Sequence, residues 1–236
     1  MQLHYCSDYD KMSKKGAEFL VSELVRHQDL LFCTATGNSP QGVYKNMALV
    51  KKEQSEIFNS LQVIKLDEWG GLPAGHPSSC EVFLKEHVLV PLDIPMERYI
   101  GFKNDVEDPV LECERIQTEL KQRGPIDICI LGMGKNGHIG FNEPAEFLNP
   151  HCHIAELTVE SQKHQMVSEV KVKPKYGLTL GMADILSSKK ILLLVTGSGK
   201  QQTIKKFLTG EINYYLPASL LWRHHDAHCF IDVSAS

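Results

Sequence analysis

The chain has 236 residues, of which 42% are hydrophobic, and a formal net charge of −4 at pH 7. This length can bury a full core, and we interpret residues 1–236 as a single domain. Scattered Lys and Arg argue against a nucleic-acid partner, which usually requires a concentrated basic face. No stretch approaches the roughly 20 apolar residues of a membrane span. The N-terminus lacks the apolar core of a signal peptide, so we expect a cytoplasmic protein with no membrane partner.

Seven cysteines are spread widely along the chain, without a C-x-x-C pair. Their odd number and their spacing indicate neither a disulfide framework nor a thiolate zinc site. The triplet His151-Cys152-His153 and the three histidines near the C-terminus suggest a metal at first sight. Adjacent residues do not readily face one ion together, and no second ligand pair has zinc-like spacing. We therefore expect no metal site.

Predicted helices and strands alternate along the chain. Apolar residues at helical spacing predict an amphipathic N-terminal helix through Met12, Gly16, Leu20 and Leu24. Short apolar runs predict strands at Leu30–Thr34, Leu61–Leu66, Asp127–Leu131, Ile191–Thr196 and His228–Val233. Start signals predict further helices at Ser39-Pro40, after Ser78-Ser79 and at Asp108-Pro109.

This alternation predicts an α/β fold with a mostly parallel sheet. The strands are almost continuously apolar, which indicates helices on both faces of the sheet. The segment Pro144–Pro174 fits the scheme least well, because it carries three prolines and polar runs. We interpret residues 144–175 as a lid that covers the site.

Four strands end in polar loops, and ligands of open parallel sheets bind beyond the carboxyl ends of the strands. The first loop, Thr36-Gly37-Asn38-Ser39, and the fourth, Gly197-Ser198-Gly199-Lys200, each open a helix. A helix N-terminus favours an anion, and Lys200 adds a positive charge, so these loops predict a phosphate site. The alternative is that Ser39 and Ser198 only cap their helices.

The second and third loops carry candidate acid–base groups. Asp67-Glu68-Trp69 follows one strand, and the run from Gly132 to Pro144 supplies His138 and Glu143. Carboxylates and a histidine beside exposed backbone suit proton transfer on a polar substrate. The alternative for Asp67 and Glu68 is an ordinary solvated turn.

Two loops match nucleotide-binding motifs only in part. Gly132-x-Gly134-x-x-Gly137 matches a dinucleotide fingerprint, but the run up to Pro144 leaves little room for the long helix that should follow it. The loop at Lys200 lacks the spacing of a P-loop and its Ser or Thr after the lysine. We therefore expect no cofactor.

The sequence resembles the glucosamine/galactosamine-6-phosphate isomerase (deaminase) family nearly from end to end. The resemblance is carried by Lys65-Leu-Asp-Glu-Trp69, by Leu72-Pro73 and by the specific run Gly-His-Ile-Gly-Phe-Asn-Glu-Pro ending at Pro144. It implies a modified doubly wound, Rossmann-like sheet without a nucleotide. Details such as Trp69, where the glucosamine enzymes more often have Tyr, and Ser79-Cys80-Glu81 with Phe83-Leu84 resemble the galactosamine-6-phosphate branch.

The resemblance also implies roles for single residues. Asp67 would move a proton between C2 and C1 of the opened sugar, and His138, oriented by Glu143, would assist ring opening. Asn136 stands where the glucosamine enzymes have an acid, so its role would be positional. The resemblance places Thr36, Gly37, Asn38, Ser39 and Lys200 at the phosphate. Lys163 or His164 would stand there in place of a lid Arg. Glu68, Gly134 and Gly137 would contact the sugar.

These features predict an enzyme that converts a hexosamine 6-phosphate, with galactosamine 6-phosphate as the first hypothesis, into a ketose 6-phosphate and ammonia. Three alternatives stay open at this point: a glucosamine-6-phosphate deaminase, a 6-phosphogluconolactonase, and a sugar-phosphate-sensing domain without catalysis. The expected partner is a small sugar phosphate. The oligomeric state stays open, with a homo-oligomer as one alternative.

Overall fold

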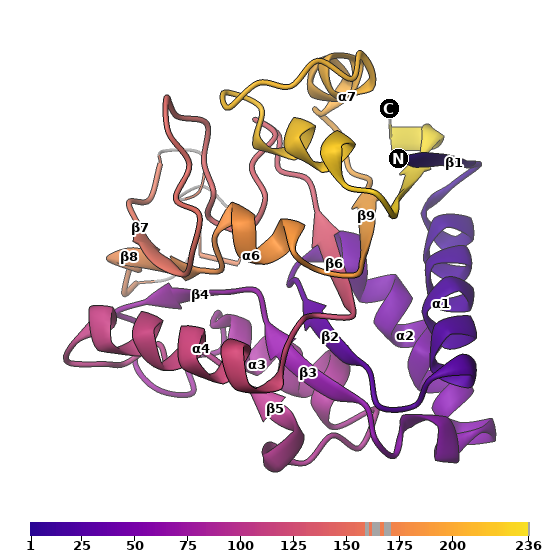
Figure 1. Ribbon diagram of the computed structural model, residues 1–236, viewed down its shortest axis with the longest axis horizontal. Helices are drawn as coiled ribbons and strands as arrows, with labels where there is room; N and C mark the ends of the chain where they lie inside the picture. The colour runs from indigo at the N-terminus through magenta and orange to yellow at the C-terminus, as the bar shows by residue number, and fades with distance from the viewer. Residues whose placement is uncertain (159–160, 162–165, 168–170, 236) are drawn as a thin grey trace.

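The computed structural model describes residues 1–158, 161, 166–167 and 171–235 of the chain. The strands in this described part are β1 (Gln2–Cys6), β2 (Leu31–Thr34), β3 (Gln62–Lys65), β4 (Asp67–Gly70), β5 (Tyr99–Ile100), β6 (Ile128–Gly132), β7 (His153–Ala155), β8 (Tyr176–Thr179), β9 (Lys190–Val195) and β10 (Ala227–Asp232). The main sheet has seven parallel strands in the order β1-β10-β9-β6-β2-β3-β5. A smaller antiparallel sheet, β4-β8-β7, lies beside it on the left of Figure 1.

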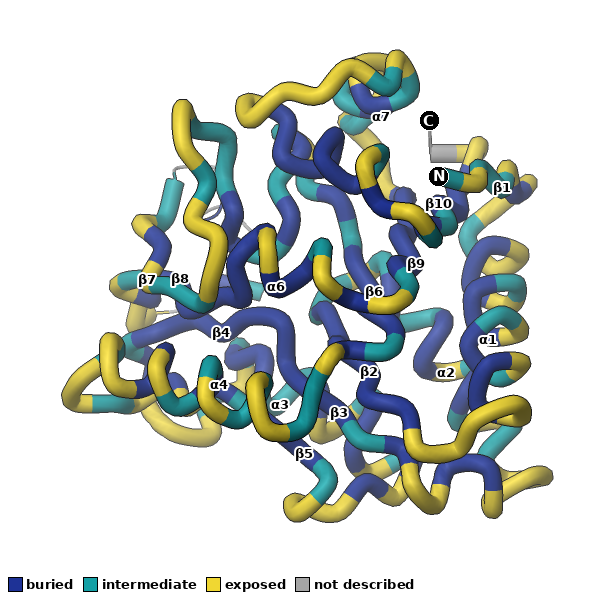
Figure 2. The backbone as a smooth tube through the Cα atoms, in the orientation of Figure 1, coloured by how far each residue is buried: buried dark blue, intermediate teal, exposed yellow. Residues whose placement is uncertain are grey.

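Helices cover both faces of the main sheet. They include α1 (Tyr9–Arg26), α2 (Asn38–Glu53), α3 (Cys80–Leu84), α4 (Pro109–Arg123), α6 (Met182–Leu186) and α7 (Gln201–Leu208), with a π-helix, η2 (Lys85–Leu89), continuing α3. Successive side chains of a strand point to opposite faces of a sheet. Accordingly, Ile128 and Ile130 of β6 pack with residues of α1 and α2, whereas Cys129 and Leu131 pack with residues of α4, α6 and α7. Figure 1 shows the same arrangement, and Figure 2 shows the strands between the helices as buried.

The strand predictions are confirmed. All five predicted strands are present, as β2, β3, β6, β9 and β10, with each end within one residue of its expected position. The mostly parallel sheet with helices on both faces is confirmed as well. Two strands of the main sheet were not predicted: β5, which has only two residues, and β1 at the sheet edge, where only Cys6 is buried and the apolar signal is weak.

Two of the three predicted helix starts are confirmed. The side chain of Asp108 accepts hydrogen bonds from the first turn of α4, and Ser79 does the same for α3. The prediction at Ser39-Pro40 is wrong, because α2 already begins at Asn38 and Gly37 occupies the N-cap. Gly37 has φ of 99°, a left-handed conformation that glycine adopts without strain. No side chain therefore caps α2 from the N-cap position, and Ser39 lies inside the helix.

The order of the strands fixes where a ligand would bind. From β2 the chain builds outward through β3 and β5, and β6 then returns to the other side of β2 and is followed by β9 and β10. The strand order therefore reverses between β2 and β6. In open α/β sheets the crevice at such a reversal, beyond the carboxyl ends of the strands, is the usual ligand site.

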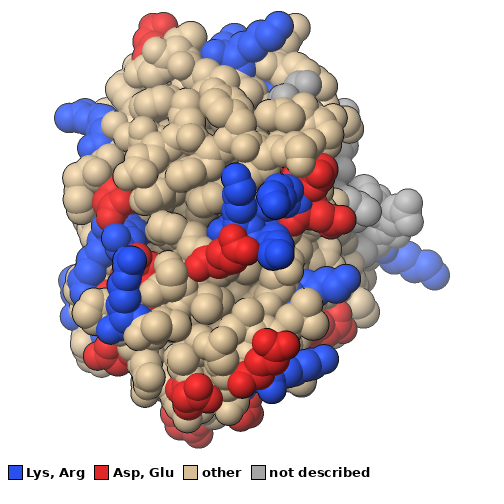
Figure 3. All heavy atoms as spheres, turned by 90° about the vertical axis from the view of Figure 1, so that its right-hand side faces the viewer, with Lys and Arg blue, Asp and Glu red and all other residues tan. Residues whose placement is uncertain are grey.

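The surface over α1 carries mixed charge. Figure 3 shows this face, on which Lys and Arg side chains lie next to Asp and Glu side chains. Such mixing is typical of an ordinary solvated surface. Among the described residues, no helix combines the length and the apolar character that crossing a bilayer requires.

Candidate active site

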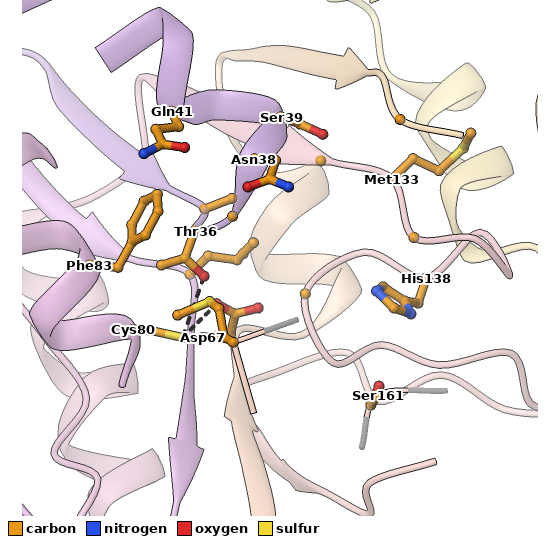
Figure 4. Close-up of a pocket in the computed structure, with 18 of the residues that line it drawn as sticks. Thr36, Asn38, Ser39, Gln41, Asp67, Cys80, Phe83, Met133, His138 and Ser161 are labelled. Atoms are coloured by element: carbon orange, nitrogen blue, oxygen red, sulfur yellow. Dashed lines mark hydrogen bonds between the residues drawn. The ribbon is translucent and has the colours of Figure 1, made fainter. Parts of the chain in front are cut away.

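A cavity of about 790 Å³ lies at the reversal point between β2 and β6. Its walls come from the four loops that follow β2, β3, β6 and β9, together with residues of α3 and of the segment between β7 and β8. The loops far apart in sequence thus meet at one edge of the sheet, as predicted. Figure 4 shows the cavity, where Thr36, Cys80 and Asp67 cluster and His138 approaches the same space from the loop after β6.

Asp67 is held where the chain passes from the main sheet to the smaller one. Leu66 still bonds to the main sheet through its N–H to Thr34 O, at 3.1 Å, and Asp67 is the first residue of β4. The Asp67 side chain lines the cavity although the residue is only 9% exposed. The Cys80 thiol donates to Asp67 Oδ1 at 4.0 Å, and Thr36 Oγ1 donates to the same sulfur at 3.4 Å.

The environment of Asp67 makes it a stronger base than an ordinary aspartate. Burial, and then the negative charge of Glu68, raise the pKa of Asp67 to about 7, although His138 and Lys65 act in the opposite direction. A general base works best when its pKa lies near the operating pH. The loop after β6 approaches Asp67 closely at Gly140, where an added Cβ would lie 3.5 Å from Oδ2 and 2.7 Å from the hydroxyl of Thr179.

His138 is oriented by a set of polar neighbours. Its Nδ1 lies 3.3 Å from Glu143 Oε1, and its backbone N–H donates to Asn136 Oδ1 at 3.2 Å. The Asn136 amide donates to Glu143 Oε2 at 2.7 Å, and the Ser161 hydroxyl donates to the other carboxylate oxygen. Burial alone would raise the pKa of Glu143, but His138, followed by Ser161 and Asn136, lowers it to about 2. Glu143 is therefore an anion that faces the imidazole.

The other end of the cavity is suited to an anion. Residues at the N-termini of α2 and α7 line it, and neither helix has a side-chain cap at its N-cap position. Lys200 and Lys135 both line this end, and among the described residues neither amine has an ion-pair partner. Burial, and then the charge of Lys135, lower the pKa of Lys200 to about 8. Two cations beside helix N-termini favour a phosphate group.

Most of the predicted site residues line the cavity. They are Thr36, Gly37, Asn38, Ser39, Asp67, Gly134, His138 and Lys200. Asn136 and Glu143 lie directly behind His138 and act on it without lining the cavity. The His138 ring packs against the backbone of Gly134, where an added Cβ would overlap the imidazole. His164 and Lys163, predicted at the phosphate, lie outside the described residues.

Two predicted sugar contacts do not lie in the cavity. Glu68 is fully buried on the other side of β4, because consecutive residues of a strand point in opposite directions. Its carboxylate accepts hydrogen bonds from the backbone and from Lys65. Gly137 has φ of 86° and its carbonyl accepts from Ala218 N–H at 2.9 Å, so it shapes the loop and is not among the residues that line the cavity.

Several cavity residues were not predicted from the sequence. Besides Lys135, they include Gln41, Cys80, Phe83, His87, Ser161 and Met166. Ser161 and Met166 belong to the segment predicted as a lid, so this segment does contribute to the cavity wall; its motion as a lid stays a prediction. Cys80 and Phe83 follow the Ser79 helix cap, and no local signal in the sequence indicated that their side chains line a cavity.

The comparison with known proteins assigns a family. The family described as glucosamine-6-phosphate isomerases/6-phosphogluconolactonase matches residues 8–230. The chain belongs to this family. The resemblance read from the sequence is thus confirmed, and with it the expectation that the protein is an enzyme.

Among the described residues, no three His, Cys, Asp or Glu side chains are grouped to hold a metal ion.

Relatives match this family member over almost its entire length. A protein from Escherichia coli (strain K12) named "Putative deaminase AgaI" is 37% identical, with 98% of this chain and 92% of the relative covered. A glucosamine-6-phosphate deaminase from Alkaliphilus oremlandii (strain OhILAs) is 34% identical, with 100% and 99% covered.

Solved structures share the fold. A monomeric glucosamine-6-phosphate deaminase of the NagB superfamily superposes with a TM-score of 0.92 at 30% identity, and all of both chains is covered. A 6-phosphogluconolactonase from Thermotoga maritima has a TM-score of 0.76 at 19% identity, with 98% of each chain covered, which shows the common fold. The modified doubly wound fold is thereby confirmed.

Proposed function

We propose that this family member is a hexosamine-6-phosphate deaminase/isomerase and that galactosamine 6-phosphate is its substrate. The observation that carries the proposal is the pairing, in one cavity, of a buried carboxylate whose pKa is about 7 with an anion site at the opposite end. A sugar phosphate bound at Lys200 would extend toward Asp67 and His138. The names of the deaminase relatives agree with this reading.

The first chemical step is ring opening. His138 lines the cavity and its imidazole faces the Glu143 anion, so it can pass a proton between the ring oxygen and the C1 hydroxyl. In this chain Asn136 is neutral and donates to Glu143, so it holds the carboxylate and takes no part as an acid. The open-chain aldehyde results.

Asp67 then carries the isomerisation. Its carboxylate removes the proton at C2, and the C1 oxygen takes up a proton, which gives a C1–C2 enolamine. Asp67 returns the proton to C1, which leaves an iminium ion at C2. Water adds to C2, the C–N bond breaks, and ammonia leaves with a ketose 6-phosphate as the second product; from galactosamine 6-phosphate this is tagatose 6-phosphate. Burial of the base shields this proton transfer from water.

The choice of the galacto sugar rests on the cavity wall. Trp69 and Cys80, two residues that resemble the galactosamine-6-phosphate branch, both line the cavity. Trp69 packs edge-on against Phe141, with ring centroids 4.6 Å apart, so its position is fixed by the core. Residues that differ between branches therefore lie where the substrate would be in contact.

A glucosamine-6-phosphate deaminase is the second candidate, because relatives with this name are 34% identical over the full chain. The deciding experiment measures ammonia release from galactosamine 6-phosphate and glucosamine 6-phosphate at equal concentrations, with hydrolysis of 6-phosphogluconolactone alongside. A larger kcat/KM for galactosamine 6-phosphate supports the proposal. A larger value for the gluco sugar assigns the second candidate, and lactone hydrolysis without ammonia release overturns both.

A further inference from the structure

Beneath the cavity, Glu68 forms a buried cluster that the reaction steps above do not use. Asp67 and Glu68 are neighbours on β4, yet the first faces the cavity and the second faces the interior. Lys65 and Glu68 are both fully buried, with Lys65 Nζ 2.8 Å from Glu68 Oε2. Taking such a pair out of water costs free energy, and a buried ion pair does not by itself stabilise a fold. The presence of Lys65 and Glu68 in the interior therefore calls for another reason.

The Glu68 carboxylate connects β4 to the first turn of α3. Oε1 accepts hydrogen bonds from the backbone N–H of Trp69 at 2.8 Å and of Cys80 at 2.9 Å. Oε2 accepts from Glu81 N–H at 2.8 Å in addition to Lys65. Cys80 and Glu81 are the first two residues of α3, where free N–H groups and the helix dipole favour an anion. The anion at this helix terminus is a side chain from the strand of the catalytic base.

This connection acts on Asp67 through Cys80. The Cys80 thiol donates to Asp67 Oδ1 and forms part of the cavity wall, and the Cys80 N–H is held by Glu68. Lys65 completes the cluster, because its amine also donates to Glu81 Oε2 and to Phe102 O, each at 2.7 Å. Lys65 thereby binds both Glu68 and Glu81, the second residue of α3.

We propose that Glu68 is a positioning residue for the reaction, which with Lys65 holds the first turn of α3 against Asp67 and sets the strength of Asp67 as a base. The inference rests on the proposed role of Asp67. Glu68 was predicted to contact the sugar; in this proposal it acts on Asp67 through Cys80 instead.

The charges around Asp67 give the inference a signature with a sign. After burial, Glu68 is the largest influence that raises the pKa of Asp67, and His138 and Lys65 lower it. The Cys80 thiol also faces the carboxylate, and burial raises its pKa well above the usual range, so it stays neutral. Removal of the Glu68 charge should therefore lower the pKa of Asp67, and removal of the Lys65 charge should raise it.

The experiment measures kcat and KM against pH for wild type, Glu68→Gln, Lys65→Met and Glu81→Gln. Glu81→Gln is the matched control, because it also removes a carboxylate partner of Lys65 but leaves the α3 N–H groups bonded to Glu68. In Glu68→Gln we expect the acid limb of kcat/KM to move about one unit lower. We expect kcat to fall about 10-fold, since the geometry at Asp67 is lost, with little change in KM. Lys65→Met should move the limb higher, and Glu81→Gln should leave it in place.

A double variant, Lys65→Met with Glu68→Gln, covers the case in which a single variant leaves a buried charge alone and does not fold. Its acid limb should return close to that of wild type, while kcat stays low because α3 has lost its anionic acceptor. An unmoved acid limb in Glu68→Gln, or wild-type kcat in the double variant, overturns the inference. Asp67→Asn separates this failure from that of the proposed function. If Asp67→Asn is fully active, Asp67 is not the base and the proposed mechanism fails. If it is inactive, Asp67 remains the base and only the role of Glu68 is overturned.

Discussion

The two ends of the cavity are lined by different kinds of chemical groups. At the anion end, glycine-containing loops present the N-termini of α2 and α7, and Lys200 and Lys135 supply charge from within their own loops. At the acid–base end, Asp67 is nearly buried and depends on groups from other parts of the chain, such as Glu68, Cys80 and His138. One end therefore relies on backbone and on the cations Lys200 and Lys135, and the other on burial and pairing.

This difference separates binding from chemistry. A cation and helix N-termini that bind a non-reacting phosphate interact with it equally in the ground state and in the transition state, which lowers KM without raising kcat. Burial removes hydration that would favour the charged form of the Asp67 carboxylate, so its pKa is about 7 and it can exchange a proton at a physiological pH. Changes at the anion end should therefore move KM, and changes at the acid–base end should move kcat.

The largest effect is expected at Asp67. Asp67→Asn keeps the shape of the side chain but cannot accept a proton, so kcat should fall roughly 10²-fold or more while KM changes little. Deuterium at C2 of the substrate should slow the wild type if proton abstraction limits the rate, and solvent exchange at C1 of the product should disappear in the variant. Asp29→Asn, at an exposed carboxylate, is the control. A variant at position 67 that retains most of its kcat would mean that another group is the base.

The corresponding change at the anion end is Lys200→Met. Loss of a charge-assisted hydrogen bond to phosphate costs about 1.5–3 kcal/mol, so KM should rise about 10- to 100-fold with a small change in kcat. Lys205→Met, an exposed lysine on the same helix α7, should leave KM unchanged. The dephosphorylated amino sugar should be an equally poor substrate for wild type and variant. A KM for Lys200→Met equal to that of wild type would return Lys200 to an ordinary surface charge.

The pH profile reports both ends in a single measurement. Below pH 7 Asp67 gains a proton and cannot act as a base, and above pH 8 Lys200 loses its positive charge, so kcat/KM should be bell-shaped between about 7 and about 8. Outside this window it should fall about 10-fold per unit. The profile of kcat should lack the alkaline limb, because bound phosphate favours the charged form of Lys200. An alkaline limb of equal position in kcat would assign it to a group other than the phosphate ligand.

The same difference between the two ends explains what could be predicted from the sequence. The anion end depends on neighbours in sequence: a strand, a glycine, a hydroxyl and a helix start, so Gly37 and Lys200 were found. The acid–base end depends on contacts distant in sequence. Asp67 and Glu68 look alike in the motif, and only the register of β4 separates a cavity residue from a buried one.

Contacts across long stretches of chain carry no local pattern, and these were missed. Glu68 meets Cys80 twelve residues later, and Ser161 meets Glu143 eighteen residues away. The smaller sheet was missed for the same reason, since Asp67–Gly70 is too short and polar to indicate a strand without its partner β8. The helix start at Asn38 was misplaced because Pro40 is also tolerated later in the first turn.

The smallest expected effect concerns Lys135, whose exposed side chain lines the anion end. An exposed cation contributes about 0.2–1 kcal/mol, so Lys135→Met should raise KM only about 2- to 5-fold, and less at high salt. Its second effect is more diagnostic. The charge of Lys135 helps to lower the pKa of Lys200, so its removal should move the alkaline limb of kcat/KM to higher pH. Lys135→Arg keeps the charge and should keep both values. If Lys135→Met raises KM and leaves the alkaline limb in place, Lys135 contacts the phosphate but does not act on Lys200; if neither changes, the anion end consists of Lys200 and the helix N-termini.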